Sequence, residues 1–194
     1  MKHTLSKLRG FTLIELMVSI VIFSVITGIV LSSNKTFGTN AKLVNASEDM
    51  VLALRQAQVY GVSSKRNTDT NGNAIVCGTS AFDCRLGVNF SLASPRQFFV
   101  FVDVDDSKTY NTGDIIIDTI SLATPLSISA IDCLPHITGC IGNVLNVTFK
   151  RPNPDAIITD STTGGGYDEA HVVVSDGIKN TIIDISRTGQ ISLQ

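Results

Sequence analysis

Residues 9–23 of the chain have the sequence RGFTLIELMVSIVIF, and they belong to a long apolar stretch near the start. From Phe11 to Ser32 there are 22 residues, and Glu15 is the single charge among them. A helix of this length spans roughly 33 Å, about the hydrocarbon core of a bilayer. An acidic residue inside a membrane-spanning helix costs roughly 2.5–3.5 kcal/mol on insertion scales. The stretch therefore predicts a membrane helix in which Glu15 requires a specific reason.

The charges around the apolar stretch predict its orientation. Lys2, Lys7 and Arg9 precede it, and Lys35 is the first charge after Glu15. Basic residues favour the cytoplasmic side, so the part of the chain that follows is expected to be exported. A routine secretory signal peptide fits poorly, because the apolar run is too long and no small-x-small cleavage site follows it. A plain signal anchor fits the length but leaves Glu15 unexplained.

The segment Arg9–Met17, RGFTLIELM, resembles the prepilin signature of type IV pilins and type II secretion pseudopilins. The resemblance implies that a prepilin peptidase cuts after Gly10 on the cytoplasmic side and methylates the new N-terminus at Phe11. It also implies that the apolar helix stays on the mature protein. The expected partners are this peptidase, other pilin or pseudopilin subunits, and the inner-membrane assembly platform.

Cleavage after Gly10 gives Glu15 a physical role. The new α-amino group at Phe11 would lie one helical turn before Glu15, so the two can pair within one chain. In a fibre, the carboxylate can instead meet the terminal amine of a neighbouring subunit. N-methylation keeps the positive charge. A buried charge is tolerable when it is paired, so Glu15 is interpreted as the residue that sets the assembly register.

Residues 41–61 have the periodicity of an amphipathic helix. One face holds Leu43, Ser47, Met50, Leu54, Ala57 and Gly61. The sequence predicts one long helix over roughly 12–61, with a candidate break near 33–40. Its first half is apolar on all sides, and its second half is expected to pack on a sheet.

Short strand patterns follow, separated by turn residues. They occupy Arg85–Phe90, Gln97–Val102, Asp114–Ile120, Val144–Lys150, His171–Ser175, Thr181–Ser186 and Gln190–Leu193. The segment Asn153–Glu169 is predicted to be a loop. Successive hairpins indicate an antiparallel sheet, so the predicted class is α+β, with a pilin-like long helix packed on an antiparallel β-sheet domain. The predicted divisions are 1–10 (cleaved leader), 11–33 (transmembrane and assembly helix), 34–62 (its amphipathic second half) and 63–194 (sheet domain).

The C-terminal half resembles the GspH/FimT-like branch of minor pilins and pseudopilins. The similarity lies in VTFKRPNPDA, then HVVVSDGIKNTIIDIS, then RTGQISL. One member type of that branch binds DNA through arginines in a terminal Gly-Arg-x-Arg motif. Here the matching positions are Gly189-Gln190-Ile191-Ser192, so both arginines are missing. The chain also has a net charge of −2, which gives phosphates no general attraction. Nucleic acid is therefore not an expected partner.

Four cysteines form two pairs, Cys77 with Cys84 and Cys133 with Cys140, each with six residues between. An even number of cysteines in an exported chain suggests disulfides, and four cysteines allow three connectivities. The short-range pairing is preferred, with four reduced and buried thiols as the alternative. Zinc is disfavoured because its paired ligands usually lie two to four residues apart. Disulfides would place the folded part outside the reducing cytoplasm.

The segment Phe98–Asp118 contains the one candidate metal site. Against the calcium loop pattern D-x-[DN]-x-[DN]-G-x5-E, the candidate ligands are Asp103, Asp105, Ser107, Asn111 and Asp114. Lys108 replaces the glycine of that pattern, and Asp114 replaces its bidentate glutamate. The alternative is a solvated acidic hairpin. Calcium is the only cofactor that the sequence suggests.

Nothing in the sequence indicates catalysis. It has no serine elbow, HExxH motif or phosphate-binding glycine loop, and its histidines are His3, His136 and His171. The expected protein is thus a minor pilin or pseudopilin, anchored once in the inner membrane with an extracytoplasmic domain before assembly. The competing interpretation is a binding module at a pilus tip, either an adhesin or a DNA-uptake pilin.

Overall fold

The computed structural model describes residues 10–63, 66–69, 71–78, 80–135, 140–161 and 166–194, and for 32–37 the backbone alone. The chain divides into two compact units, residues 1–40 and 41–194. The first unit consists, over its described residues, of the start of helix α1 (Leu13–Val62). This helix is continuous, so the candidate break near 33–40 is not present.

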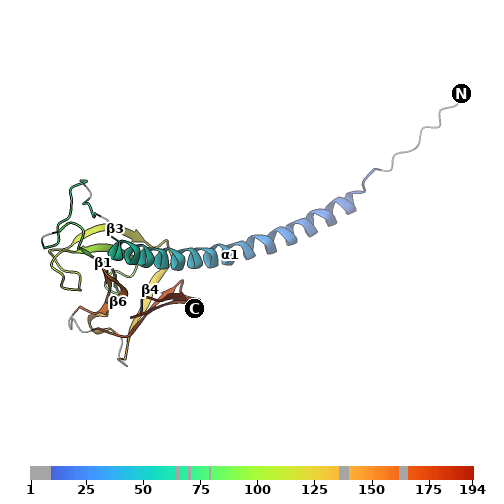
Figure 1. Ribbon diagram of the computed structural model, residues 1–194. Helices are drawn as coiled ribbons and strands as arrows, with labels where there is room; N and C mark the ends of the chain where they lie inside the picture. Colours follow the sequence, from blue (N-terminus) through green and yellow to red (C-terminus); the bar gives the residue numbers. More distant parts are fainter. Residues whose placement is uncertain (1–9, 64–65, 70, 79, 136–139, 162–165) are drawn as a thin grey trace, which may run out of the picture. The chain divides into compact units, whose positions relative to one another are not determined.

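The second unit combines the rest of α1 with two antiparallel sheets (Figure 1). One sheet has the strand order β3-β2-β1-β5-β6, and the other has the order β4-β7-β8-β9. The strands are β1 (Arg85–Ser91), β2 (Gln97–Asp103), β3 (Ile115–Ser121), β4 (Ser127–Leu134), β5 (Val144–Lys150), β6 (Asn153–Thr159), β7 (Glu169–Ser175), β8 (Asn180–Ser186) and β9 (Ile191–Leu193), with a short 3-10 turn, η1 (Ile141–Asn143), before β5. The α+β class is confirmed, although the sequence predicted one sheet where the chain forms two.

The core of this unit is built by the amphipathic half of α1. Leu43, Ser47, Met50, Leu54 and Ala57 are all buried, as the helical periodicity predicted. Each large apolar side chain that is fully buried contributes roughly 1.5–3 kcal/mol. The helix shares one apolar cluster with both sheets, including Phe90, Val147, Val172 and Ile183. The helix therefore ties the two sheets into one domain.

Two predictions of local structure were wrong. The segment Asn153–Glu169 is not a loop throughout, because β6 forms within it and pairs with β5. Its Pro154 disguised the strand, but proline is tolerated there since β6 is the edge of the sheet. Strand β4 was not predicted at all. A register shift between Ile128 and Ala130 breaks the strict alternation of its buried side chains.

Helix α1 approaches β5 most closely at Gly61. A Cβ atom built on Gly61 would lie 2.6 Å from the carbonyl oxygen of Phe149. The backbone N–H of Arg151 also donates to the carbonyl oxygen of Gly61 at 3.0 Å. Backbone atoms can move aside only at a high cost in free energy. The packing of α1 on β5 therefore requires a glycine at this position.

Replacing Gly61 with alanine is therefore expected to destabilise the sheet domain by about 1–3 kcal/mol, although alanine favours helix. The measurement is chemical unfolding of the purified full chain, followed by circular dichroism. Gly38→Ala is the matched control, because a Cβ there would meet nothing within 4 Å. Equal or greater stability of Gly61→Ala would contradict the proposed close contact.

Candidate functional site

The predicted membrane segment is a regular helix whose side chains have no cover within the chain. Residues Leu13–Leu31 are long and apolar enough to cross a bilayer, and none of this span is buried. Phe11, Leu13, Ile14 and Phe23 are each at least 70% exposed. Such a continuous apolar surface is far larger than a soluble monomer exposes. It requires lipid or the helices of other subunits as its surroundings.

Glu15 takes part in the start of the helix. Thr12 precedes the first helical residue, and its hydroxyl oxygen accepts a hydrogen bond from the backbone N–H of Glu15 at 3.4 Å. In return, the backbone N–H of Thr12 donates to Glu15 Oε2 at 3.5 Å, and the Thr12 hydroxyl donates to the same oxygen at 3.3 Å. These contacts are long, but their pattern is that of a capping box. The spacing Thr-x-x-Glu in the sequence could have revealed this second role.

Gly10 lies just outside the helix, next to the predicted cleavage point. A Cβ atom at Gly10 would meet nothing within 4 Å, and the residue does not have the positive φ that favours glycine. Among the described residues, therefore, no neighbouring atom of the chain itself requires a glycine here. A requirement for glycine would have to come from another molecule that approaches this backbone.

The cysteines are joined in the preferred short-range pairs. The structure places Cys77 in a disulfide with Cys84, and Cys133 in a disulfide with Cys140, with Cα–Cα distances of 5.1 Å and 4.8 Å. Cys84, Cys133 and Cys140 are buried in the core cluster. Each bond closes a short loop beside a strand, Cys84 directly before β1 and Cys133 within β4. Disulfides of this kind suit an oxidising compartment.

The acidic loop between β2 and β3 brings together the residues predicted to bind calcium. Carboxylate oxygens of Asp103, Asp105 and Asp114 lie within 4.8 Å of one another, and they form the one such cluster found in the described part of the chain. Asn111 joins them, because its amide nitrogen donates to Asp105 Oδ2 and to the Ser107 hydroxyl.

The three carboxylates already accept hydrogen bonds from the loop. Asp103 accepts from the backbone N–H groups of Ser107 and Lys108 at 3.0 and 2.8 Å. Asp105 accepts from Ser107 and from the Asn111 amide. Asp114 accepts from the backbone N–H groups of Val104 and Asn111. All six oxygens thus have an N–H donor, which is the arrangement that a solvated acidic hairpin needs. Calcium binding stays a prediction from the sequence.

A buried cation lies beside this cluster. Arg85, at the start of β1, is only 5% exposed, and its Nε lies 2.9 Å from Asp106 and 3.5 Å from Asp103. Lys150 reaches Asp106 from β5 at 3.0 Å. These pairs join the loop to two central strands. The sequence alone did not reveal Arg85, because it lies next to the acidic residues only after β1 and β2 pair.

Asp103 has the most strongly shifted carboxyl group of the loop. Burial raises the pKa of Asp103 to about 6, and a hydrogen bond with Asp105 and the charge of Asp114 act in the same direction. The N–H groups of Lys108 and Ser107 oppose this rise because they stabilise the carboxylate. Burial likewise raises the pKa of Asp114.

The remaining sequence candidates lie apart from this loop. His171 on β7 lies 3.5 Å from both Glu169 and Asp184, beside its strand neighbours. Arg187 pairs with Asp168 at 3.3 Å and lies on the exposed turn before β9. His3 and His136 fall outside the described residues. These residues form ion pairs with their neighbours. They do not place a nucleophile next to a base.

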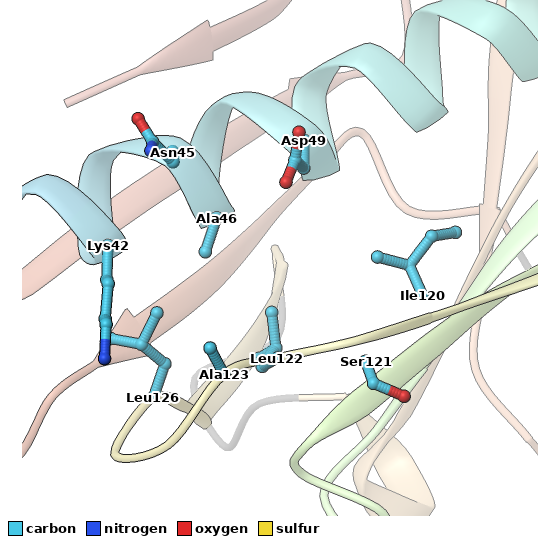
Figure 2. Close-up of a pocket in the computed structure, with 9 residues that line it drawn as sticks. All are labelled: Lys42, Asn45, Ala46, Asp49, Ile120, Ser121, Leu122, Ala123 and Leu126. Carbon is cyan, nitrogen blue, oxygen red and sulfur yellow. The ribbon is translucent and has the colours of Figure 1, made fainter.

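A shallow groove lies between α1 and the connection from β3 to β4 (Figure 2). Ala46, Leu122, Ala123 and Leu126 give it an apolar floor, and Lys42 and Asp49 lie at its helix side. Figure 2 shows Ala46 and Asp49 projecting from the helix toward this connection. The groove combines apolar contact with one charge of each sign, which suits packing better than chemistry.

Comparison with known proteins finds one match. Residues 5–31 match the family model described as the prokaryotic N-terminal methylation motif. This motif includes Gly10, Phe11 and Glu15, and it supports a place in the type IV pilin and pseudopilin superfamily. It points to a structural, membrane-anchored subunit that a prepilin peptidase processes and that assembles with other pilins. No curated protein and no solved structure matches the chain.

The shifted carboxyl group gives a prediction for pH. Because the pKa of Asp103 in the folded chain lies above the ordinary aspartate value of 3.8, folding favours the protonated form. This stabilisation is full below pH 3.8 and is lost as the pH rises through about 6. The shift corresponds to roughly 2–3 kcal/mol. The difference in unfolding free energy between the wild type and Asp103→Asn should therefore fall by about this amount from acid to neutral pH.

The measurement is denaturant unfolding of both chains across that pH range. Asp118→Asn, an exposed carboxylate on β3, serves as the matched control. A difference that does not change with pH would contradict the role of Asp103. Repeating the series with calcium tests the metal, because a bound cation would keep Asp103 ionised and abolish the pH dependence.

Proposed function

We propose that the chain is a structural minor pilin or pseudopilin subunit of a type IV pilus or a type II secretion pseudopilus. The observation that carries this proposal is the helix that follows Gly10 and Phe11. It is apolar and exposed on every side over Leu13–Leu31, and it holds a single carboxylate in its first turn. Helix packing in the core of a fibre supplies both the apolar surroundings and the partner charge that this helix lacks.

The proposed organisation follows from this helix. A leader over 1–10 is removed, 11–33 anchors and assembles the subunit, 34–62 is the amphipathic half, and 63–194 is the sheet domain. The domain lies outside the cytoplasm, which the two disulfides support. The inner-membrane assembly platform then extracts the subunit into the fibre.

The C-terminal strands support the GspH/FimT-like branch. Strands β7 and β8 form a hairpin, and β9 returns after the Thr188-Gly189 turn to pair with β8 at the edge of the smaller sheet. A final hairpin followed by a terminal strand is the arrangement expected of the GspH/FimT-like branch, so it supports this part of the proposal. Gly189 has a φ of +81° in that turn, which explains a glycine at this position.

Cleavage after Gly10 gives the first test of the proposal. Gly10→Leu should block processing, because a bulky side chain prevents the peptidase from approaching the backbone, whereas Gly10→Ala should be processed better. The measurement is the ratio of precursor to mature chain on immunoblots after expression with a prepilin peptidase. Since no atom of the described residues lies within 4 Å of a Cβ at this position, both variants should fold alike. Equal processing of Gly10→Leu would contradict the cleavage site.

Glu15 can be tested so that charge and capping are separated. Gln can still accept a hydrogen bond at this position of a capping box, but it carries no charge. If Glu15 pairs with the terminal amine of a neighbour, Glu15→Gln and Glu15→Ala should both be processed and inserted, and both should join fibres poorly. We expect incorporation to fall at least about tenfold, since losing one partner of a buried ion pair costs about 3–5 kcal/mol.

The measurement is the amount of each variant in sheared fibres relative to the membrane fraction. Thr12→Ala is the matched control, because it removes the cap and keeps the charge. Normal incorporation of Glu15→Gln alongside a defect in Glu15→Ala would assign Glu15 to the helix cap instead.

Gene deletion separates the two assembly systems. Surface pili and secreted enzymes are measured in the same cultures. Loss of pili with normal secretion identifies a pilus subunit, and retained pili with enzymes trapped in the periplasm identify a secretion pseudopilin. If both remain intact, the structural role is contradicted and the pilus-tip binding module takes its place.

A further inference from the structure

The face of the five-stranded sheet that lies opposite α1 carries a partly buried polar surface. Along β1, Leu86, Val88 and Phe90 point into the core with the helix, so Asn89 points to the other face. Asn146 lies directly opposite Asn89 on β5. Both amides are at least 95% buried, although they lie on the side of the sheet that the helix does not cover.

The acidic loop provides the cover. It folds back over this face, and the backbone N–H of Tyr110 donates to Asn146 Oδ1 at 3.2 Å. The Tyr110 ring packs edge to face on Phe99 and Phe101, with centroid distances of 4.7 and 5.4 Å. The Thr159 hydroxyl donates to the carbonyl oxygen of Lys108 at 2.8 Å. The loop does not cover the whole face. An open part remains between Tyr110 and the ends of β1 and β2.

This open part is a hollow of about 320 Å³. It is lined by the amides of Asn89 and Asn146, by the aromatic rings of Phe99 and Tyr110, and by the polar side chains of Gln97 and Ser94. None of its lining residues, all of which the structure describes, carries a charge. The hollow combines aromatic carbon with several neutral hydrogen-bonding groups, and it offers no positive charge to a phosphate or a carboxylate.

Asn89 provides a second and independent observation. Its amide nitrogen donates to Asn146 Oδ1 at 2.7 Å, but its amide oxygen has no hydrogen-bond partner among the described residues. Asn89 is only 4% exposed, and the hollow is where this oxygen can find a donor. This oxygen is not among the buried side-chain atoms that lack a partner, so it is open to solvent and can accept a hydrogen bond from a ligand in the hollow.

We propose that this hollow binds a neutral, hydroxyl-rich ligand, namely a single pyranose of a glycan. A hydroxyl of the sugar donates to Asn89 Oδ1, and the amide of Gln97 bonds a second hydroxyl. The C–H face of the ring packs against Tyr110 and Phe99. The site lies on the side of the sheet that the amphipathic half of α1 does not cover.

The test uses the full chain in a detergent that has no sugar headgroup, with a panel of methyl glycosides of common hexoses and N-acetylhexosamines as probes. Binding is followed by saturation-transfer NMR and by chemical-shift changes at the hollow. We expect at least one glycoside to bind with a dissociation constant on the order of 1 mM, which is typical for so small a ligand. No binding by any glycoside would overturn the proposal.

Two variants locate the binding. Gln97→Ala removes an exposed amide that makes no hydrogen bond in the described chain, and Tyr110→Phe keeps the ring contacts while removing the hydroxyl. Gln97→Ala should weaken binding roughly fivefold, the effect of losing one hydrogen bond, whereas Tyr110→Phe should leave binding unchanged because the proposed contact is with the ring. Gln56→Ala, an equally exposed glutamine on α1, should leave binding unchanged.

Unfolding curves of the three variants establish that each is folded. Glycoside binding that is unchanged in Gln97→Ala would place the binding site elsewhere and overturn the proposal. Binding of N-acetyl amides of short peptides in the hollow, with no binding of glycosides, would also overturn it. These measurements use the unassembled chain, so their outcome is independent of the proposed role in a fibre.

Discussion

The burial of one face of α1 against two sheets is the contact on which the folded domain depends. Met50, Leu54 and Ala57 are completely covered, and they belong to the same apolar cluster as the central strands of both sheets. Polar contacts fix the same helix at its end, where Gln58 donates to the carbonyl oxygens of Pro154 and Gly189. Without the helix, neither sheet would have a partner for its apolar face.

The same helix carries two different surfaces along its length. After Ala41 its apolar residues form a stripe that the sheets cover. Over Leu13–Leu31 they lie on every side, and no described residue of the chain buries them. Folding buries the first surface, whereas only lipid or other helices can bury the second. Under the proposed function, folding and assembly use different halves of one helix.

The acidic loop has a structural role whether or not it binds a cation. Its carboxylates accept N–H groups of the loop itself, and Asp106 links it to Arg85 and Lys150 on the central strands. These contacts hold Tyr110 against Phe99 and Phe101 and so shape the neutral hollow beside it. The candidate metal site and the proposed sugar site therefore share one loop. A mutation that changes the loop would affect both sites.

The sequence by itself determined the local features of this protein. A run of apolar residues after Gly10, the periodicity of 41–61 and the close cysteine spacings are patterns of neighbouring residues, so they predicted the membrane segment, the buried helix face and the disulfide pairs. Only the tertiary structure decided which strands pair. It divided them into two sheets, allowed β6 to form despite Pro154, and brought Arg85, Asn89 and Asn146 together with a loop distant in sequence. Such contacts depend on strand register and on burial, which no short stretch of residues specifies.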